Sequence, residues 1–148
     1  MTKGVRIGVD VGSVRVGVAA SDPDARLAFP VTAVQRRRDG SDLDELAGLI
    51  AERAGVEVVV GLPRTLAGRE GMAVDAARAY AEALSERVAP IPVTLVDERL
   101  TTVVADQALR AARPRSSARD RRAAIDAAAA AGILQTYLDG MARKDPHE

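Results

Sequence analysis

Residues 7–22, IGVDVGSVRVGVAASD, predict a β-hairpin that carries a charged residue in its first strand. Two apolar runs rich in valine and alanine flank a Gly12-Ser13 turn, which is the pattern of two antiparallel strands joined by a tight connection. Asp10 lies inside the first run, where a carboxylate needs a compensating partner. Three explanations for Asp10 are open at this point: a metal ion, a phosphate-bound nucleotide or a turn cap.

The whole chain predicts one α/β domain. Strands are expected at 5–11, 14–20, 26–34, 56–63 and 91–98. Helices are expected from an N-cap at Ser41 to a terminating Gly55, and at 72–88, 101–111 and 118–138. The order β-β-β-α-β-α-β-α-α predicts a mixed sheet whose first three strands are antiparallel, with helices on both faces. We expect a single domain over 1–140 and a flexible C-terminal tail over 141–148.

The composition excludes several kinds of chemistry. The 148 residues contain no cysteine and one histidine, His147, which stands in the polar end of the chain. A disulfide framework, a thiolate zinc site and a triad around a buried imidazole are therefore excluded. No apolar run approaches the ~18 residues of a membrane span, and the N-terminus has no signal-peptide pattern. A cytoplasmic protein without membrane contact is expected.

Three acidic positions, far apart in the sequence, are expected at one edge of the sheet. Asp10 lies where the first strand ends, and Asp97 and Glu98 lie where the fifth strand ends. In open α/β sheets, ligands collect beyond the carboxyl ends of the parallel strands. Asp126 stands on the apolar stripe of the last helix, which should pack on the sheet. Carboxylates without histidine or cysteine favour Mg²⁺ or Mn²⁺, the ions that support phosphodiester hydrolysis.

Each of these acids also has a local alternative. Asp10 can cap a turn, Asp97 or Glu98 can begin the next helix, and Asp126 can pair with Arg122 one turn earlier. Neighbouring strand residues face opposite sides, so Asp97 and Glu98 cannot both face one site, and their spacing does not choose between them. All three alternatives must hold together for the site to vanish, which favours the functional interpretation.

Four segments carry a resemblance to a known family. They are GVDVGSVRVGVAASD, VVVGLPRTLAGREG, VDERLTT and IDAAAAAGILQTYLD, and they cover nearly the whole chain in order. Together they resemble the motifs of the YqgF family, also called RuvX, of bacterial nucleases in the ribonuclease H-like (RNase H-like) superfamily. The resemblance implies an RNase H-like fold with a five-stranded mixed sheet and a metal-dependent nuclease. It also implies a role in maturing the 5′ end of pre-16S ribosomal RNA or, by similarity to junction resolvases, in DNA recombination.

The resemblance also implies which acids act. Asp10 matches the first-strand catalytic aspartate, Glu98 the glutamate of the Asp-Glu-Arg motif, and Asp126 the acid of the last helix. All three would be catalytic residues and ligands of Mg²⁺ or Mn²⁺. A fourth carboxylate, which related resolvases carry one turn further along this helix, is replaced here by alanine and glycine.

Arginines near these motifs are candidates for binding nucleic acid, because a guanidinium can hold two phosphate oxygens at once. The candidates are Arg15 in the hairpin, Arg64, Arg99, and the loop residues Arg110, Arg113, Arg115 and Arg119. Such contacts give affinity without sequence choice, so structured RNA or branched DNA would be selected by shape. A homodimer would suit symmetric cleavage of a junction.

Two other functions compete. Actin-like and sugar-kinase-like ATPases also begin with Asp-x-Gly after a first strand, but they bind nucleotide between two copies of the fold, and this chain has room for one. The second competitor is a non-catalytic nucleic-acid-binding module for ribosome assembly. The presence of all three acids favours the nuclease.

Overall fold

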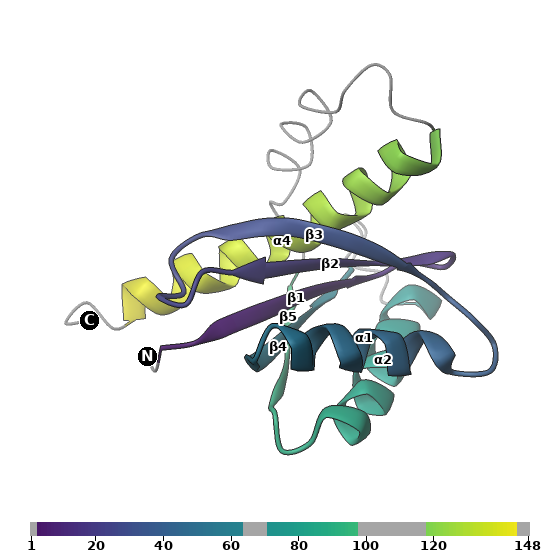
Figure 1. The fold of residues 1–148 in the computed structure, drawn as a ribbon, viewed down its shortest axis with the longest axis horizontal. Helices are drawn as coiled ribbons and strands as arrows, with labels where there is room; N and C mark the ends of the chain where they lie inside the picture. The colour runs from purple at the N-terminus through teal and green to yellow at the C-terminus, as the bar shows by residue number, and fades with distance from the viewer. Residues whose placement is uncertain (1–2, 64–70, 98–117, 145–148) are drawn as a thin grey trace.

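The computed structural model describes residues 3–63, 71–97 and 118–144 (Figure 1). Its elements are β1 (Val5–Val11), β2 (Arg15–Ser21), β3 (Ala28–Gln35), α1 (Ser41–Glu52), β4 (Gly55–Leu62), α2 (Met72–Val88), β5 (Val93–Asp97) and α4 (Ala118–Lys144). The bounds of β1 and α2 are those that the sequence predicts. The expected helix at 101–111 lies outside the described residues.

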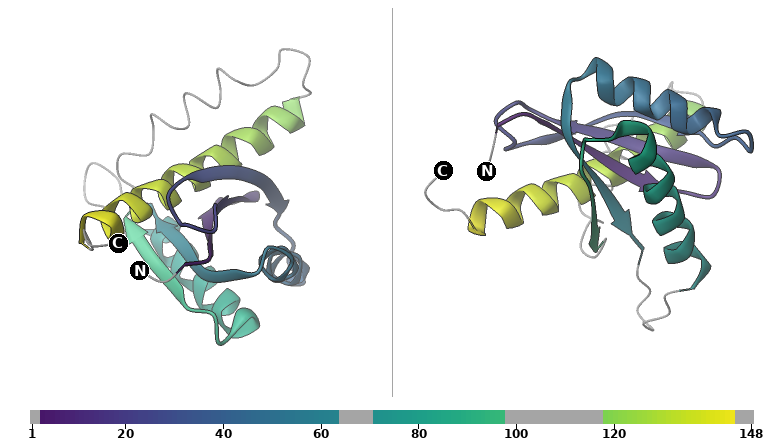
Figure 2. Two further views of the ribbon diagram at one scale, coloured as in Figure 1. Left: turned by 60° about the vertical axis from the view of Figure 1, so that its left-hand side comes forward. Right: turned by 90° about the horizontal axis from the view of Figure 1, so that it is seen from below.

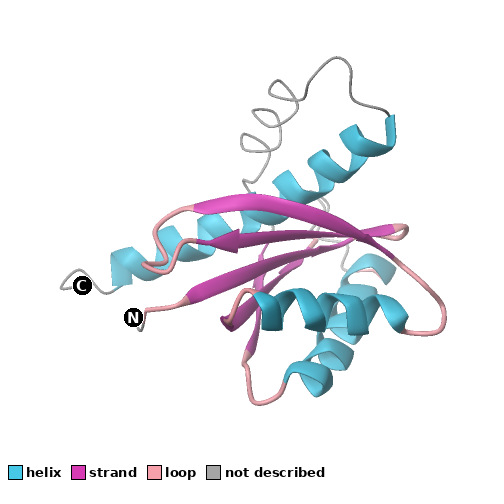
Figure 3. Cartoon of the chain, in the orientation of Figure 1, coloured by secondary structure: helices cyan, strands magenta, loops and turns pink. Residues whose placement is uncertain are grey.

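The strands form a five-stranded mixed sheet in the order β3-β2-β1-β4-β5. β1 pairs antiparallel with β2, and β2 with β3, whereas β1–β4 and β4–β5 are parallel. The predicted mixed sheet with three antiparallel leading strands is therefore confirmed. Helices α1 and α2 cover one face of the sheet and α4 crosses the other (Figures 2 and 3).

Each face of the sheet has its own apolar core. The α1/α2 face is built from large side chains such as Ile7, Leu46 and Leu84, all of which are fully buried. The α4 face is built from smaller ones, including Ala19 and Ala130, together with Leu134. Small residues bring α4 close to the sheet, so the backbone of this helix lies directly on the strands.

Helix α1 differs from the sequence-based expectation at both of its ends. The N-cap of α1 is Gly40 rather than Ser41, and the carboxylate of Asp39 accepts hydrogen bonds from the Ser41 backbone N–H at 3.0 Å and hydroxyl at 2.7 Å. Gly55 does not end α1. Ala54 takes the left-handed conformation with φ 54°, and Gly55 begins β4.

The last helix is longer than predicted. α4 continues past residue 138 to Lys144, so the first part of the expected tail, 141–144, is helical. The polar composition of this segment suggested a tail, but methionine, alanine, arginine and lysine are all strong helix formers. None of the described helices is long and apolar enough to cross a membrane.

Candidate active site

Asp10 faces the α4 side of the sheet near the end of β1. In the antiparallel pairing of β1 with β2, Asp10 is the partner of Gly17. Directly opposite residues in such a pair point to the same face. A Cβ built on Gly17 would overlap the backbone carbonyl oxygen of Asp126, so this face is the one that α4 covers. Alternation along β1 agrees, because a Cβ on Gly8 would lie 2.7 Å from the carbonyl oxygen of Ala130 in α4.

Asp126 is brought to the same place by close backbone packing. The missing side chain at Gly17 is what allows the α4 backbone at Asp126 to contact β2. Gly17 and Asp10 are neighbours across the β1–β2 ladder, so α4 passes over the strands at the level of Asp10. Two of the three predicted acids therefore lie on one face at the carboxyl end of β1.

Arg15 pairs with one of these two acids, Asp126. It is two residues before Gly17 in β2, so its side chain also lies on the α4 face. Its Nε donates a hydrogen bond of 2.6 Å to Oδ2 of Asp126, and each of the two side chains is 27% exposed. Within the described part of the chain, Asp126 pairs with Arg15 of another element rather than with Arg122 one turn earlier in its own helix. The helix ion pair considered from the sequence is wrong.

The structure separates Asp97 from this group. Asp97 is the β5 partner of Leu62 in the β4–β5 ladder. Leu62 packs against Val74 and Ala77 of α2, which places Asp97 on the opposite face from α4. Val96, the residue before it, packs into the core on the α4 side. Asp97 therefore does not share a site with Asp10 and Asp126.

Most of the other predicted site residues lie beyond what the structure describes. Glu98, Arg64, Arg99, Arg110, Arg113 and Arg115 are all outside the described residues. Arg119 belongs to the first turn of α4. Their roles stay predictions.

The turn that follows Asp10 is held by a residue whose role the sequence did not indicate. Arg36 is the first of three consecutive arginines at 36–38, a charged run of the kind that usually forms a solvated surface. Its Nη1 donates to the Gly12 carbonyl at 3.2 Å, and its guanidinium lies 5.1 Å from the centre of the Tyr80 ring. The Tyr80 hydroxyl in turn donates at 3.0 Å to Asp42, which is 2% exposed. Burial raises the pKa of Tyr80, so its hydroxyl stays protonated as the donor.

The donors that the structure brings together suit a hard cation. The carboxylates of Asp10 and Asp126 supply oxygen ligands only, which favours Mg²⁺ or Mn²⁺ over softer metals. Among residues 3–63, 71–97 and 118–144, no group of three or more potential ligands forms a complete metal site. The third predicted ligand, Glu98, lies outside those ranges. The described residues thus fit part of an oxygen site.

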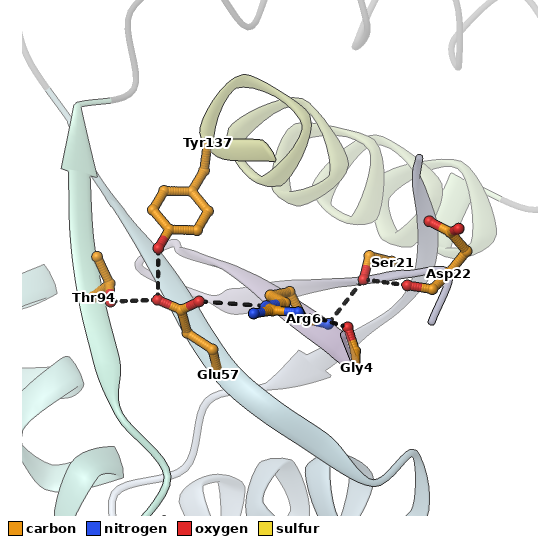
Figure 4. Close-up of polar contacts among 7 residues, drawn as sticks. All are labelled: Gly4, Arg6, Ser21, Asp22, Glu57, Thr94 and Tyr137. Atoms are coloured by element: carbon orange, nitrogen blue, oxygen red, sulfur yellow. Dashed lines mark hydrogen bonds and ion pairs between the residues drawn. The ribbon is translucent and has the colours of Figure 1, made fainter. Parts of the chain in front are cut away.

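A second charged cluster lies at the other end of the α4 face (Figure 4). Arg6 of β1 is 4% exposed, and its Nε contacts Oε1 of Glu57 in β4 at 3.4 Å. Oε2 of Glu57 accepts hydrogen bonds from the Tyr137 hydroxyl of α4 at 2.7 Å and from Thr94 of β5 at 2.8 Å. Burial, followed by the hydrogen bond to Glu57, raises the pKa of Tyr137 to about 12. This cluster ties α4 to three strands.

Comparison with known sequences identifies a family. The family described as "RuvX: Holliday junction resolvase" matches residues 4–140. Two curated relatives are named "Putative pre-16S rRNA nuclease". The one from Mycolicibacterium paratuberculosis is 58% identical over 137 residues, covering 93% of this chain and 81% of the relative. The one from Mycobacterium tuberculosis is 57% identical over 137 residues, covering 93% and 79%.

Solved structures of resolvases share the fold. Thermus thermophilus RuvC in complex with a Holliday junction substrate matches with a TM-score of 0.56 at 13% identity, covering 93% of this chain and 96% of that one. Fowlpox virus resolvase with its substrate Holliday junction DNA matches with a TM-score of 0.55 at 8% identity, covering 93% and 98%. At these identities the likeness shows the fold alone, and the fold is RNase H-like.

Proposed function

The chain belongs to the RuvX family, and on that basis we propose that it is a divalent-metal-dependent nuclease that hydrolyses phosphodiester bonds. Its proposed reaction is the processing of the 5′ end of pre-16S ribosomal RNA, as the names of its relatives suggest. The observation that carries the proposal is the convergence of Asp10 from β1 and Asp126 from α4 on one face at the carboxyl end of the parallel strands.

Asp10, Glu98 and Asp126 would hold Mg²⁺ or Mn²⁺. Glu98, which lies outside the described residues, is included because it matches the glutamate of the family's Asp-Glu-Arg motif. A bound ion supplies an activated water and stabilises the leaving oxygen. The protein's own part is to hold the carboxylates in place, since the Gly17–α4 contact fixes the Asp126 backbone and the Arg36–Gly12 hydrogen bond anchors the turn after Asp10.

The arginines would bind the nucleic-acid backbone. Arg64, Arg99, Arg110, Arg113, Arg115 and Arg119 carry this role in the proposal. Phosphate contacts position a substrate without reading its sequence, and the chain has few aromatic side chains on which bases could stack. Substrate selection would therefore depend on the shape of a structured RNA. An RNA precursor as substrate places the protein in the cytoplasm.

Cleavage of an RNA fragment spanning the 5′ end of 16S rRNA, with Mg²⁺ or Mn²⁺, tests the proposal. We expect the parent to cut and Asp126→Asn to lose at least about 100-fold in rate, because removing one member of a hard-ion site weakens both ion binding and charge stabilisation. Asp139→Asn is the matched control, since Asp139 is an exposed acid on the same helix and should leave the rate unchanged. An Asp126→Asn variant that cuts as fast as the parent would rule out the catalytic assignment.

Holliday junction resolution is the second candidate, favoured by the description of the matching family and by the RuvC-like fold. The same assay with a four-way DNA junction ranks the two substrates. Symmetric cleavage of a junction would need two active sites, so we propose a homodimer in this case. Tight binding of RNA or junction without cleavage by the parent would instead indicate a non-catalytic assembly module.

A further inference from the structure

The ion pair between Arg15 and Asp126 puts a fixed positive charge inside the candidate active site. The two side chains come from elements 111 residues apart in sequence, and the 2.6 Å hydrogen bond from Nε to Oδ2 is short for a pair of this kind. Each side chain is about three-quarters buried, so water screens their attraction less than at the surface. Arg15 therefore belongs to the charge balance of this site.

The geometry of the pair is imposed by the backbone. Arg15 is two residues from Gly17, whose Cα lies against the carbonyl oxygen of Asp126. The contact leaves no room for α4 to move toward β2. Both residues therefore belong to packed elements whose spacing is set by the backbone, and the hydrogen bond from Nε to Oδ2 holds the guanidinium beside Asp126.

The pair uses one of the two Asp126 carboxylate oxygens. The acids that the described residues place here are Asp10 and Asp126, and the positions one turn further along α4 are Ala129 and Ala130. Ala130 is fully buried against Gly8, so this position has no space for another acid, and Ala129 carries no carboxylate. A second divalent ion that bound Oδ2 of Asp126 would have to lie next to the guanidinium of Arg15, which carries the same sign of charge.

We propose that Arg15 is a positioning residue that takes the place of a second divalent ion on Asp126, so that the site binds a single ion beside Asp10. This inference rests on the proposed function, because a metal-dependent nuclease needs a divalent ion at this site. In this arrangement Oδ2 of Asp126 is held by Arg15, and only the other carboxylate oxygen is available to the ion. Arg15 is thereby assigned to Asp126 rather than to a phosphate of the substrate.

Counting bound Mn²⁺ on the chelator-treated full chain tests this directly, by titration calorimetry or by the electron paramagnetic resonance signal of the free ion. We expect one ion on the parent and two on Arg15→Gln, which removes the charge but keeps a polar side chain. Arg15→Lys, which restores the charge, should again bind one. The double variant Arg15→Gln/Asp126→Asn should not gain the second ion. Two ions on the parent, or one on Arg15→Gln, would overturn the proposal.

A second measurement needs no variant. The Arg15 Nε–H resonance of the parent, followed by NMR during a Mg²⁺ titration, should remain protected from solvent exchange when the ion is saturating. Loss of that protection on ion binding would mean that the pair breaks and that Arg15 does not replace an ion.

The result is separable from the nuclease assignment. A parent that binds one ion, gains a second in Arg15→Gln and cuts no nucleic acid would retain this proposal and remove the nuclease. A parent that cuts nucleic acid but whose Arg15→Gln variant binds one ion would retain the nuclease and remove this proposal.

Discussion

Helix α4 meets charged side chains at both ends of the sheet face that it covers. At the end where β1 begins, Arg6, Glu57, Thr94 and Tyr137 bring together one guanidinium, one carboxylate and two hydroxyl donors (Figure 4). At the end where β1 finishes, Arg15 pairs with Asp126, and Asp10 lies on the same face. The first group joins α4 to three strands through contacts among its own side chains, whereas the second, among the described residues, places two carboxylates and one guanidinium at the carboxyl end of β1.

The difference separates a structural cluster from a functional one. Arg6 is 4% exposed, and the carboxylate that compensates it receives hydrogen bonds on both oxygens. Such a group should contribute to stability and tolerate little change. The Asp10 end brings carboxylates of β1 and α4 to one face of the sheet, an arrangement that suits the binding of a cation. We therefore expect substitutions in the Arg6 cluster to change mainly stability and substitutions at the Asp10 end to change mainly cleavage.

The substitution Gly17→Ala is the strongest test of the close packing of α4 on β2, which brings Asp126 to the same face as Asp10. The added Cβ would overlap the carbonyl oxygen of Asp126, and neither backbone can yield easily. We expect a loss of about 3 kcal/mol or more in the free energy of unfolding, measured by urea denaturation. Gly48→Ala is the control, because a Cβ there meets nothing within 4 Å and alanine stabilises a helix interior by about 0.5–1 kcal/mol. Equal stability of the two variants would contradict the close packing of α4 on β2.

Glu57→Gln should cost nearly as much. It keeps the shape of the side chain but removes the negative charge that Glu57 places beside the buried guanidinium of Arg6, a loss of about 3 kcal/mol. The same substitution in the exposed Arg37–Glu45 pair, Glu45→Gln, should change stability by less than about 1 kcal/mol. Chemical denaturation of both variants gives the comparison, and a Glu57→Gln protein as stable as the parent would remove the structural role of this cluster.

The raised pKa of Tyr137 predicts a loss of stability in strong alkali. The folded protein holds this proton more tightly than the unfolded chain, since the pKa rises from an ordinary value of 10.0 to about 12. The contribution is complete below pH 10 and is lost as the pH rises toward 12. Tyr137→Phe should cost about 1 kcal/mol at neutral pH and reduce the decline between pH 10 and 12. An unchanged decline in thermal melts across that range would contradict the raised pKa of Tyr137 in the folded protein.

Asp10→Asn should have the smallest effect on stability. The amide keeps the shape and most of the hydrogen-bonding capacity of the side chain and removes its charge, so the free energy of unfolding should change by less than about 1 kcal/mol while cleavage is lost. Differential scanning calorimetry without added metal measures the first change. A variant that melts well below the parent would place Asp10 among the residues that stabilise the fold.

Local patterns predicted much of this arrangement. The apolar run of β1, the helical spacing of α2 and the position of Asp126 on an apolar stripe all depend on residues close in sequence, and the structure places them as expected. The partner of Asp126 could not be found in this way. Helix spacing pointed to Arg122, but the contact with Arg15 depends on the β1–β2 register and on the absence of a side chain at Gly17.

The face on which Asp97 lies also could not be predicted from local sequence. Alternation predicts that Asp97 and Glu98 face opposite sides, but the side on which Asp97 lies is decided by its pairing with Leu62 and by the packing of Leu62 on α2. The role of Arg36 could not be predicted from local sequence either. Its guanidinium donates to the Gly12 carbonyl and lies over the ring of Tyr80, which belongs to a distant helix. Contacts between elements, rather than the elements themselves, were the part that the sequence left open.

The anomalous scattering of Mn²⁺ soaked into crystals of the protein tests the central claim most directly, because it locates the ion without reference to activity. The account predicts a peak within about 2.5 Å of an Asp10 carboxylate oxygen, on the α4 side of the sheet. A peak elsewhere, with Asp10 away from any ion at saturating Mn²⁺, would contradict it.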